Sequence, residues 1–141
     1  MDADSGLVHT VIGTPANVND VTQGHGLLHG EEALVCADAG YQGADKRSEA
    51  TGVPWHIALR PGKRRAMEKQ SPWGALLEQA EKIKASVRAK VEHPFRVIKC
   101  LFGFTRVRYR SLAKNTVQLL TLFALSNLCM ARNKLARRAA A

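Results

Sequence analysis

Three charged residues stand at helical spacing in the segment KASVRAKVEHPFRVIK: Arg88, Glu92 and Lys99. On an α-helix, Glu92 would lie about 40° round from Arg88, and Lys99 about 20° back from Glu92. One carboxylate flanked by two cations on a narrow face suits a metal ion that works beside phosphate. Upstream, the apolar run LVCADAG contains Asp38, where a strand would deliver a second carboxylate to a sheet edge. The two acids predict a metal site that faces phosphate, and such a site needs a further acid.

The elements that must position these residues predict an α/β domain with parallel strands. β-Branched and apolar runs bounded by Gly and Pro predict three strands, at residues 6–13, 33–37 and 53–59. Asn17 or Asn19 is expected to cap a helix between the first two strands. The first strand begins almost at residue 1, which suggests that further strands belong upstream.

The second half of the chain is expected to be mainly helical. Long helices are predicted over residues 75–101 and 112–137, and Pro94 is expected to kink the first of them just after Glu92. Residues 60–74 (RPGKRRAMEKQSPWG) lack periodicity and predict an exposed basic loop.

The charge of the chain is divided unevenly along its length. Residues 1–57 contain two basic and eight acidic side chains, a net charge of −6, whereas residues 58–141 contain nineteen basic and four acidic, a net charge of +15. An acidic half suits divalent cations, and a strongly basic half suits a phosphate backbone. A plain solvated basic surface is the alternative interpretation.

The cysteines and the hydropathy argue against several classes of protein. Cys36, Cys100 and Cys129 are odd in number and lack zinc spacing, which fits a reducing cytoplasm. Core packing is expected for Cys36, in a predicted buried strand, and for Cys129, in an apolar helix. No secretion signal is visible at the N-terminus. The run TVQLLTLFALSNLCM is too short to span a bilayer and predicts a buried helix. The chain is therefore expected to be cytoplasmic, with no membrane partner.

Several passages together resemble the C-terminal half of insertion-sequence transposases of the Asp-Asp-Glu type, specifically the insertion-sequence-five family. They are TPANVND, LHGEEALVCADAGYQG, RPGK, KASVRAKVEHPFRVIK, LFGFTRVRYRSLAKN and LFALSNLCMAR. The family signature is Tyr, two residues, Arg, three residues, Glu, six residues, Lys. This chain meets it at Arg88, Glu92 and Lys99 and departs from it at Ala85, where the family has tyrosine.

The resemblance implies a partial ribonuclease-H-like fold that lacks its N-terminal strands and has a C-terminal helical extension. It divides the chain into a partial catalytic domain, residues 1–103, and a basic strip with a final helix, residues 104–141. By similarity, Asp38 and Glu92 are the second and third catalytic acids and ligands of Mg²⁺ or Mn²⁺. A two-ion site is expected only if the missing first Asp is supplied, because Asp2 and Asp4 are expected to be turn residues and Asp20 an acid at a helix start.

Bacterial DNA, at the element ends and at the target, is the implied partner. Contacts to DNA are expected from Arg88 and Lys99, and from Tyr41, for which plain packing is an equal alternative. A basic strip with alternating arginines is expected to contact the DNA backbone: Arg106, Arg108, Arg110 and Lys114. A solvated sheet edge is the alternative for the strip.

Two functions follow. The first is metal-dependent phosphodiester cleavage and strand transfer in DNA transposition, by a fragment that is expected to be inactive by itself. The fragment would pair with an upstream transposase fragment or form a homodimer. The alternative is a non-catalytic DNA-binding or dimerising remnant that modulates full-length transposase. A relic that does not fold alone is a third possibility.

Overall fold

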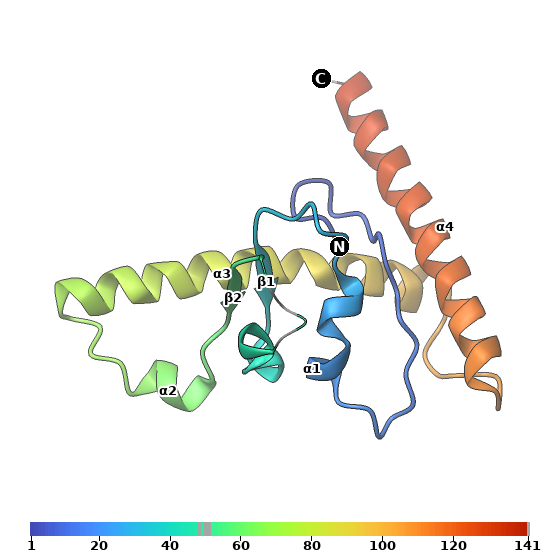
Figure 1. The fold of residues 1–141 in the computed structure, drawn as a ribbon. Helices are drawn as coiled ribbons and strands as arrows, with labels where there is room; N and C mark the ends of the chain where they lie inside the picture. The colour runs from blue at the N-terminus through green and yellow to red at the C-terminus, as the bar shows by residue number, and fades with distance from the viewer. Residues whose placement is uncertain (48, 50–51, 141) are drawn as a thin grey trace. The chain divides into compact units, whose positions relative to one another are not determined.

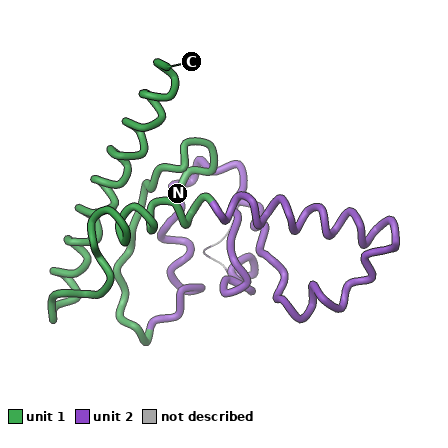
Figure 2. The backbone as a smooth tube through the Cα atoms, turned by 180° about the vertical axis from the view of Figure 1, so that it is seen from behind, with its two compact units in different colours: residues 1–17, 90–141 green, residues 18–89 purple. Residues whose placement is uncertain are grey.

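The computed structural model describes residues 1–47, 49 and 52–140 (Figure 1). The chain forms two compact units (Figure 2). The terminal unit consists of Met1–Asn17 together with Lys90–Ala141, and the central unit consists of Val18–Ala89. The predicted division at residue 103 concerns function and stays a prediction.

The central unit contains a small parallel sheet of two strands, β1 (Val35–Ala37) and β2 (Trp55–Ile57). Val35 pairs with Trp55 and Ala37 with Ile57. The predictions of these two strands and of their parallel pairing are confirmed. Proline precedes β2 at Pro54, and Asp38 follows β1 as the cap of the next 3-10 helix. Three small residues of the central unit are buried, Ala37 within β1, Ala58 directly after β2, and Ala44.

A short helical turn precedes the sheet. Helix α1 (Asp20–Gln23) begins at Asn19, whose side chain accepts a hydrogen bond from the Val21 N–H at 3.2 Å. The predicted cap at Asn19 is therefore confirmed. The chain continues as the 3-10 helix η1 (Gly24–Leu27) instead of a long α-helix, because the glycines on this stretch favour no regular helix.

Helix α3 (Pro72–Arg96) is held to the end of β2 by a buried carboxylate. Glu81 is 4% exposed, and its Oε2 accepts the Leu59 N–H at 3.0 Å. Lys84 donates to Glu81 Oε1 at 2.7 Å and to the Ile57 carbonyl at 3.2 Å. Burial raises the pKa of Glu81, but the bonds from Lys84 and the Leu59 N–H outweigh it and lower the pKa below 4.5.

Part of the predicted basic loop at residues 60–74 is helical. Helix α2 (Pro61–Arg65) starts at Pro61, whose fixed φ suits a first helical position. The Arg64 guanidinium donates two hydrogen bonds to Glu78 of α3, at 2.8 and 3.1 Å. This bidentate pair fixes α2 against the start of α3 and lowers the pKa of Glu78.

In the terminal unit, the last turn of α3 packs on the long helix α4 (Leu112–Ala139). The rings of Phe95 and Phe123 meet edge to face, with centroids 5.2 Å apart. Ser126 of α4 is fully buried and donates to the Pro94 carbonyl at 3.5 Å. Ile98, which is 2% exposed, completes this small core. The predicted final helix is confirmed, but the prediction that it is buried is wrong, because only Phe123 and Ser126 are buried among its described residues, whereas Leu120, Leu125 and Leu128 are exposed.

Helix α3 passes through Pro94 and ends in a single π-helical turn, η5 (Val97–Leu101). The Phe102 N–H donates to the Val97 carbonyl at 3.3 Å, which is the wider spacing of a π turn. Pro94 has no N–H and therefore removes one α-helical hydrogen bond. This loss explains why the helix changes from α to π just after the proline. The predicted kink itself stays a prediction.

The predicted strand at residues 6–13 is wrong. These residues contain no strand, although hydrogen bonds tie them to α4. The Asn127 side chain pairs with both backbone groups of Val8: the Val8 N–H donates to Oδ1 at 2.9 Å, and Nδ2 donates to the Val8 carbonyl at 2.8 Å. Two lysines support the pairing, since Lys90 donates to the Ala3 carbonyl at 2.7 Å and Lys134 to the Ser5 carbonyl. A side-chain amide thus takes the place of a neighbouring strand.

No helix in the described part of the chain is long and apolar enough to cross a membrane.

Candidate functional site

Asp38 stands at the carboxyl end of β1, directly after the buried Ala37. It is exposed and caps the 3-10 helix η2 (Ala39–Tyr41), with its Oδ1 accepting the Gly40 N–H at 2.8 Å. A Cβ on residue 40 would lie 2.9 Å from that oxygen, so a larger residue there would force the Asp38 carboxylate to shift. The other carboxylate oxygen of Asp38 has no hydrogen bond within the described residues. It is therefore available to a ligand.

Tyr41, three residues further on, is half-buried. A Cβ on Gly24 would contact the Tyr41 ring at 3.5 Å and the Trp55 ring at 3.3 Å, so both rings pack around this glycine. Burial raises the pKa of the Tyr41 hydroxyl, and the charges of Asp20 and Asp38 raise it further. The ring therefore has a packing role, while the hydroxyl lies in the field of two carboxylates.

Sequence reasoning missed the position of Asp20. It was expected to be an acid at a helix start, which is confirmed, because it lies in the first turn of α1. Its charge also acts on Tyr41, from an element eighteen positions before Asp38. No spacing rule could have found this proximity, because it depends on how α1 meets η2 in the folded central unit.

Glu92 and Arg88 lie one turn apart on α3, and both are exposed. Glu92 has no ion pair within the described residues, so its carboxylate is open to solvent or to a ligand. Asp38 belongs to the central unit and Glu92 to the terminal unit, so each is described within its own unit.

Lys99 is exposed in the π turn η5. A π turn closes i to i+5 hydrogen bonds and therefore takes more residues per turn than an α-helix. Lys99 consequently lies further round from Glu92 than the predicted 20°, which assumed an unbroken α-helix. Contact between Lys99 and the phosphate that Glu92 would serve stays a prediction.

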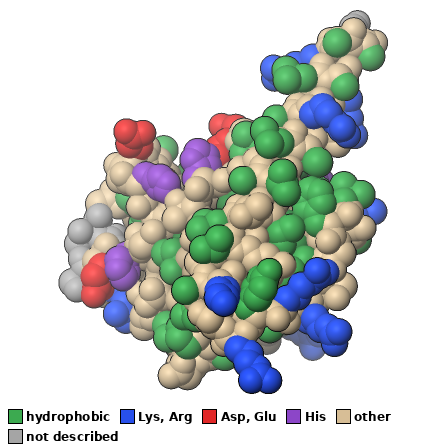
Figure 3. Space-filling model, turned by 90° about the vertical axis from the view of Figure 1, so that its right-hand side faces the viewer, with side chains coloured by type: hydrophobic (Ala, Val, Ile, Leu, Met, Phe, Trp, Pro, Cys, Tyr) green, Lys and Arg blue, Asp and Glu red, His purple; other side chains and the backbone are tan. Residues whose placement is uncertain are grey.

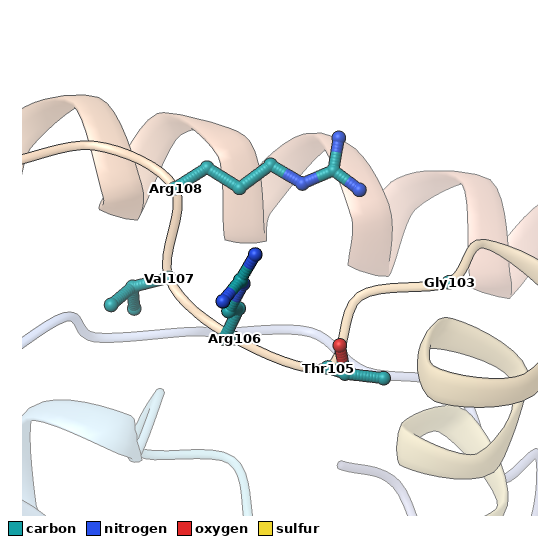
Figure 4. A pocket seen from close by; sticks show the side chains of 5 residues that line it. All are labelled: Gly103, Thr105, Arg106, Val107 and Arg108. Carbon is teal, nitrogen blue, oxygen red and sulfur yellow. The ribbon is translucent and has the colours of Figure 1, made fainter.

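The basic strip is not a strand, and the chain bends at Arg106 and Arg110, so the alternative of a protective sheet edge is wrong. Figure 4 shows that Arg106 and Arg108 project to one side and Val107 to the other. The alternation therefore holds for these two arginines without a sheet. Arg110 and Lys114, in the same part of the chain, are exposed.

The chain after Glu92 contains no Asp or Glu. Figure 3 shows the consequence on the rising end of α4, where basic and hydrophobic side chains alternate and no acidic one appears. Within the described residues, no salt bridge involves the four basic residues of the strip. Their charges are therefore free to meet an external polyanion.

Comparison with known protein families gives a match to the model of the transposase DDE domain, over residues 1–128. The chain belongs to this family. Membership in the transposase DDE domain family implies a function in DNA transposition and DNA as the partner. Members of the family generally depend on a divalent metal ion. No solved structure matches the chain.

The metal requirement of the transposase DDE domain can be compared with the donors in this chain. Asp38 and Glu92 offer carboxylate oxygens, the donor type that Mg²⁺ and Mn²⁺ prefer. Both side chains are exposed, and Asp38 keeps one oxygen free. Within the described residues, however, no three His, Cys, Asp or Glu side chains gather as a metal site. The chemistry of the donors fits, and their number is short of a complete site.

Proposed function

We propose that the chain contributes two carboxylates, Asp38 and Glu92, to metal-dependent phosphodiester cleavage and strand transfer in DNA transposition. The observation that carries the proposal is the setting of Asp38. It is exposed at the carboxyl end of a parallel strand and keeps one free carboxylate oxygen, inside a chain of the transposase DDE domain family. The carboxyl ends of parallel strands are where α/β proteins place ligands.

The proposal includes a ribonuclease-H-like arrangement of the insertion-sequence-five type. It is supported by the spacing of Arg88, Glu92 and Lys99, and by the parallel pairing of β1 with β2. The departure at Ala85 leaves this finer assignment resting on the remaining three positions.

Each residue has a distinct role in the proposed reaction. Asp38 and Glu92 would hold Mg²⁺ or Mn²⁺ through carboxylate oxygens. When bound, the divalent ions stabilise the charge on the attacking and leaving oxygens of a phosphodiester. Arg88 and Lys99 would neutralise and orient the phosphates on either side of the scissile bond. The reaction needs a third carboxylate, which we propose comes from another transposase segment.

Iron-mediated backbone cleavage tests whether Asp38 and Glu92 share an ion. Fe²⁺ takes the place of Mg²⁺, and hydroxyl radicals generated with ascorbate and peroxide cut the polypeptide near the bound ion. We expect cuts close to both Asp38 and Glu92, and we expect both to disappear in Asp38→Asn and in Glu92→Gln. Asp45→Asn, at another exposed acid of the central unit, is the matched control and should leave the cuts unchanged. Cuts near Asp38 that persist in Glu92→Gln would contradict the shared site.

The non-catalytic alternative is favoured by one observation. The chain after Glu92 contains many Lys and Arg residues and no Asp or Glu. A remnant that only binds DNA or dimerises would bind a duplex in a salt-sensitive way. Its binding would be no stronger with Mg²⁺ than with EDTA, because Mg²⁺ competes for the DNA phosphates, and it would be the same in Asp38→Asn and Glu92→Gln. Metal-stimulated binding that both substitutions abolish would exclude this alternative.

A further inference from the structure

A hollow of about 540 Å³ opens in the terminal unit, where the chain passes from the π turn η5 towards α4. It is lined by a single short loop: Gly103, Thr105, Arg106, Val107 and Arg108. Figure 4 shows the Arg106 and Arg108 side chains extending across this hollow, with the Thr105 hydroxyl at its edge and Val107 directed away. The two arginine side chains therefore lie on the same side of the loop, and the Val107 side chain lies on the other.

The loop is fixed at both ends. At its start, the Phe104 N–H donates to the carbonyl of the buried Ile98 at 3.1 Å. At its end, the Asn115 side chain of α4 forms two hydrogen bonds with the backbone of Tyr109. The Tyr109 N–H donates to Oδ1 at 3.1 Å, and Nδ2 donates to the Tyr109 carbonyl at 2.6 Å. Such anchors hold the backbone of the loop in place before a ligand arrives, which lowers the backbone entropy lost on binding.

The charges of the loop are not balanced from within. Arg106 and Arg108 form no salt bridge with a described residue, and the chain has no acid after Glu92. The backbone N–H groups of Arg106 and Arg108 donate to no described group either. Two guanidinium groups on one side of a loop repel each other unless an anion lies between them. Planar guanidinium groups bind phosphate oxygens in pairs, so phosphate is the anion that fits best.

We propose that this hollow binds one phosphate group, held jointly by Arg106 and Arg108 with the Thr105 hydroxyl as a further donor. The inference deepens the proposed function, on which it rests, because DNA is the expected source of the phosphate. A phosphodiester of DNA and free inorganic phosphate share the chemistry that the loop recognises, and the experiment separates them. In this proposal both arginines bind the same phosphate. On a general basic surface, each arginine would instead bind a separate phosphate.

The salt dependence of DNA binding gives the number of DNA phosphates that the protein neutralises. The full chain is titrated with a fluorescent 20-base-pair duplex in EDTA, from about 50 to 200 mM salt. Each neutralised phosphate contributes about 0.9 to the slope of log K against log salt concentration. If Arg106 and Arg108 share one phosphate, the slope of Arg106→Gln/Arg108→Gln falls by about 0.9. A fall of about 1.8 would show two independent phosphates and overturn the proposal, as would an unchanged slope.

A second measurement on the unmodified chain keeps the test independent of the folding of any variant. The Nε–H resonances of Arg106 and Arg108 are followed by NMR while inorganic phosphate, or the duplex, is added. Both resonances should move together. Movement with the duplex alone identifies the phosphodiester as the source, and movement with both probes shows that free phosphate also binds. Movement of neither, or of one arginine only, overturns the proposal.

Two controls separate this inference from the catalytic proposal. Arg137→Gln/Arg138→Gln removes two exposed arginines from the end of α4, and it should leave the two loop resonances responsive to phosphate. Asp38→Asn/Glu92→Gln should bind the duplex in EDTA with the same slope as the unmodified chain. The phosphate hollow can thus fail while the catalytic proposal stands, and the reverse also holds.

Discussion

The strongest expectation for stability concerns the carboxylate that joins α3 to the end of β2. Replacing Glu81 by Leu leaves the Leu59 N–H without its acceptor and leaves Lys84 with only the Ile57 carbonyl as an acceptor. An unpaired backbone donor in a buried setting costs about 1–3 kcal/mol. The Lys84 side chain is 21% exposed, so water partly replaces Glu81 as the partner of its charge. The lost ion pair therefore lowers the unfolding free energy less than the unpaired N–H does. We expect Glu81→Leu to lose about 2–3 kcal/mol of unfolding free energy.

Glu81→Gln separates the two contributions. Glutamine keeps an oxygen for the Leu59 N–H and gives up only the charge that Lys84 meets, so a loss of about 1 kcal/mol is expected. Urea unfolding followed by tryptophan fluorescence suits the measurement, because Trp55 lies in β2 beside this contact. With a urea slope of roughly 1–3 kcal/mol per molar, the midpoint of Glu81→Leu should fall by about 1 M or more.

The same contact fixes the sign of a pH effect. The folded state lowers the pKa of Glu81 below its ordinary 4.5, so its stabilising contribution is present above pH 4.5 and is lost as the pH falls through the folded value. Glu81→Leu should therefore flatten the stability profile in acid. Glu68→Gln, at an exposed glutamate of the same unit, is the control, expected within about 0.5 kcal/mol of the unmodified chain. Equal losses in Glu81→Leu and Glu68→Gln would refute the reasoning.

Three further outcomes are expected. Gly13→Ala would place a Cβ 2.1 Å from the Thr116 hydroxyl, so it should cost about 1–3 kcal/mol in thermal unfolding, and Thr116→Ala should recover much of it. Arg64→Gln should remove the acid sensitivity that the lowered pKa of Glu78 confers below pH 4.5, seen as a flatter pH profile of melting temperature. Asn127→Leu should cost about 1–2 kcal/mol and raise amide hydrogen exchange in the N-terminal segment, and unchanged exchange there would contradict the pairing.

Local signals in the sequence were enough for several elements. Residue type and periodicity were enough to predict the cap at Asn19, the strands β1 and β2, and the long helix α4. The setting of Asp38 was also predictable, because an acid after an apolar run ends a strand at its carboxyl edge.

Features decided by distant contacts were not predictable. The segment at residues 6–13 has the composition of a strand, and only the reach of Asn127 from α4 shows that a side chain pairs with it. The effect of the Asp20 charge on the pKa of Tyr41 could not be predicted either, because it depends on the fold of the central unit.

The terminal unit has a consequence for the order in which the chain folds. The central unit is one continuous stretch, so its contacts can form as soon as residues 18–89 are available. The terminal unit must instead close a loop between partners 119 residues apart, Val8 and Asn127. Closing a loop of that length carries an entropic cost that local contacts avoid. During synthesis from the N-terminus, the first residues would stay without their partners until α4 has emerged. We therefore expect the beginning of the chain to be among the last parts to gain protection from proteases.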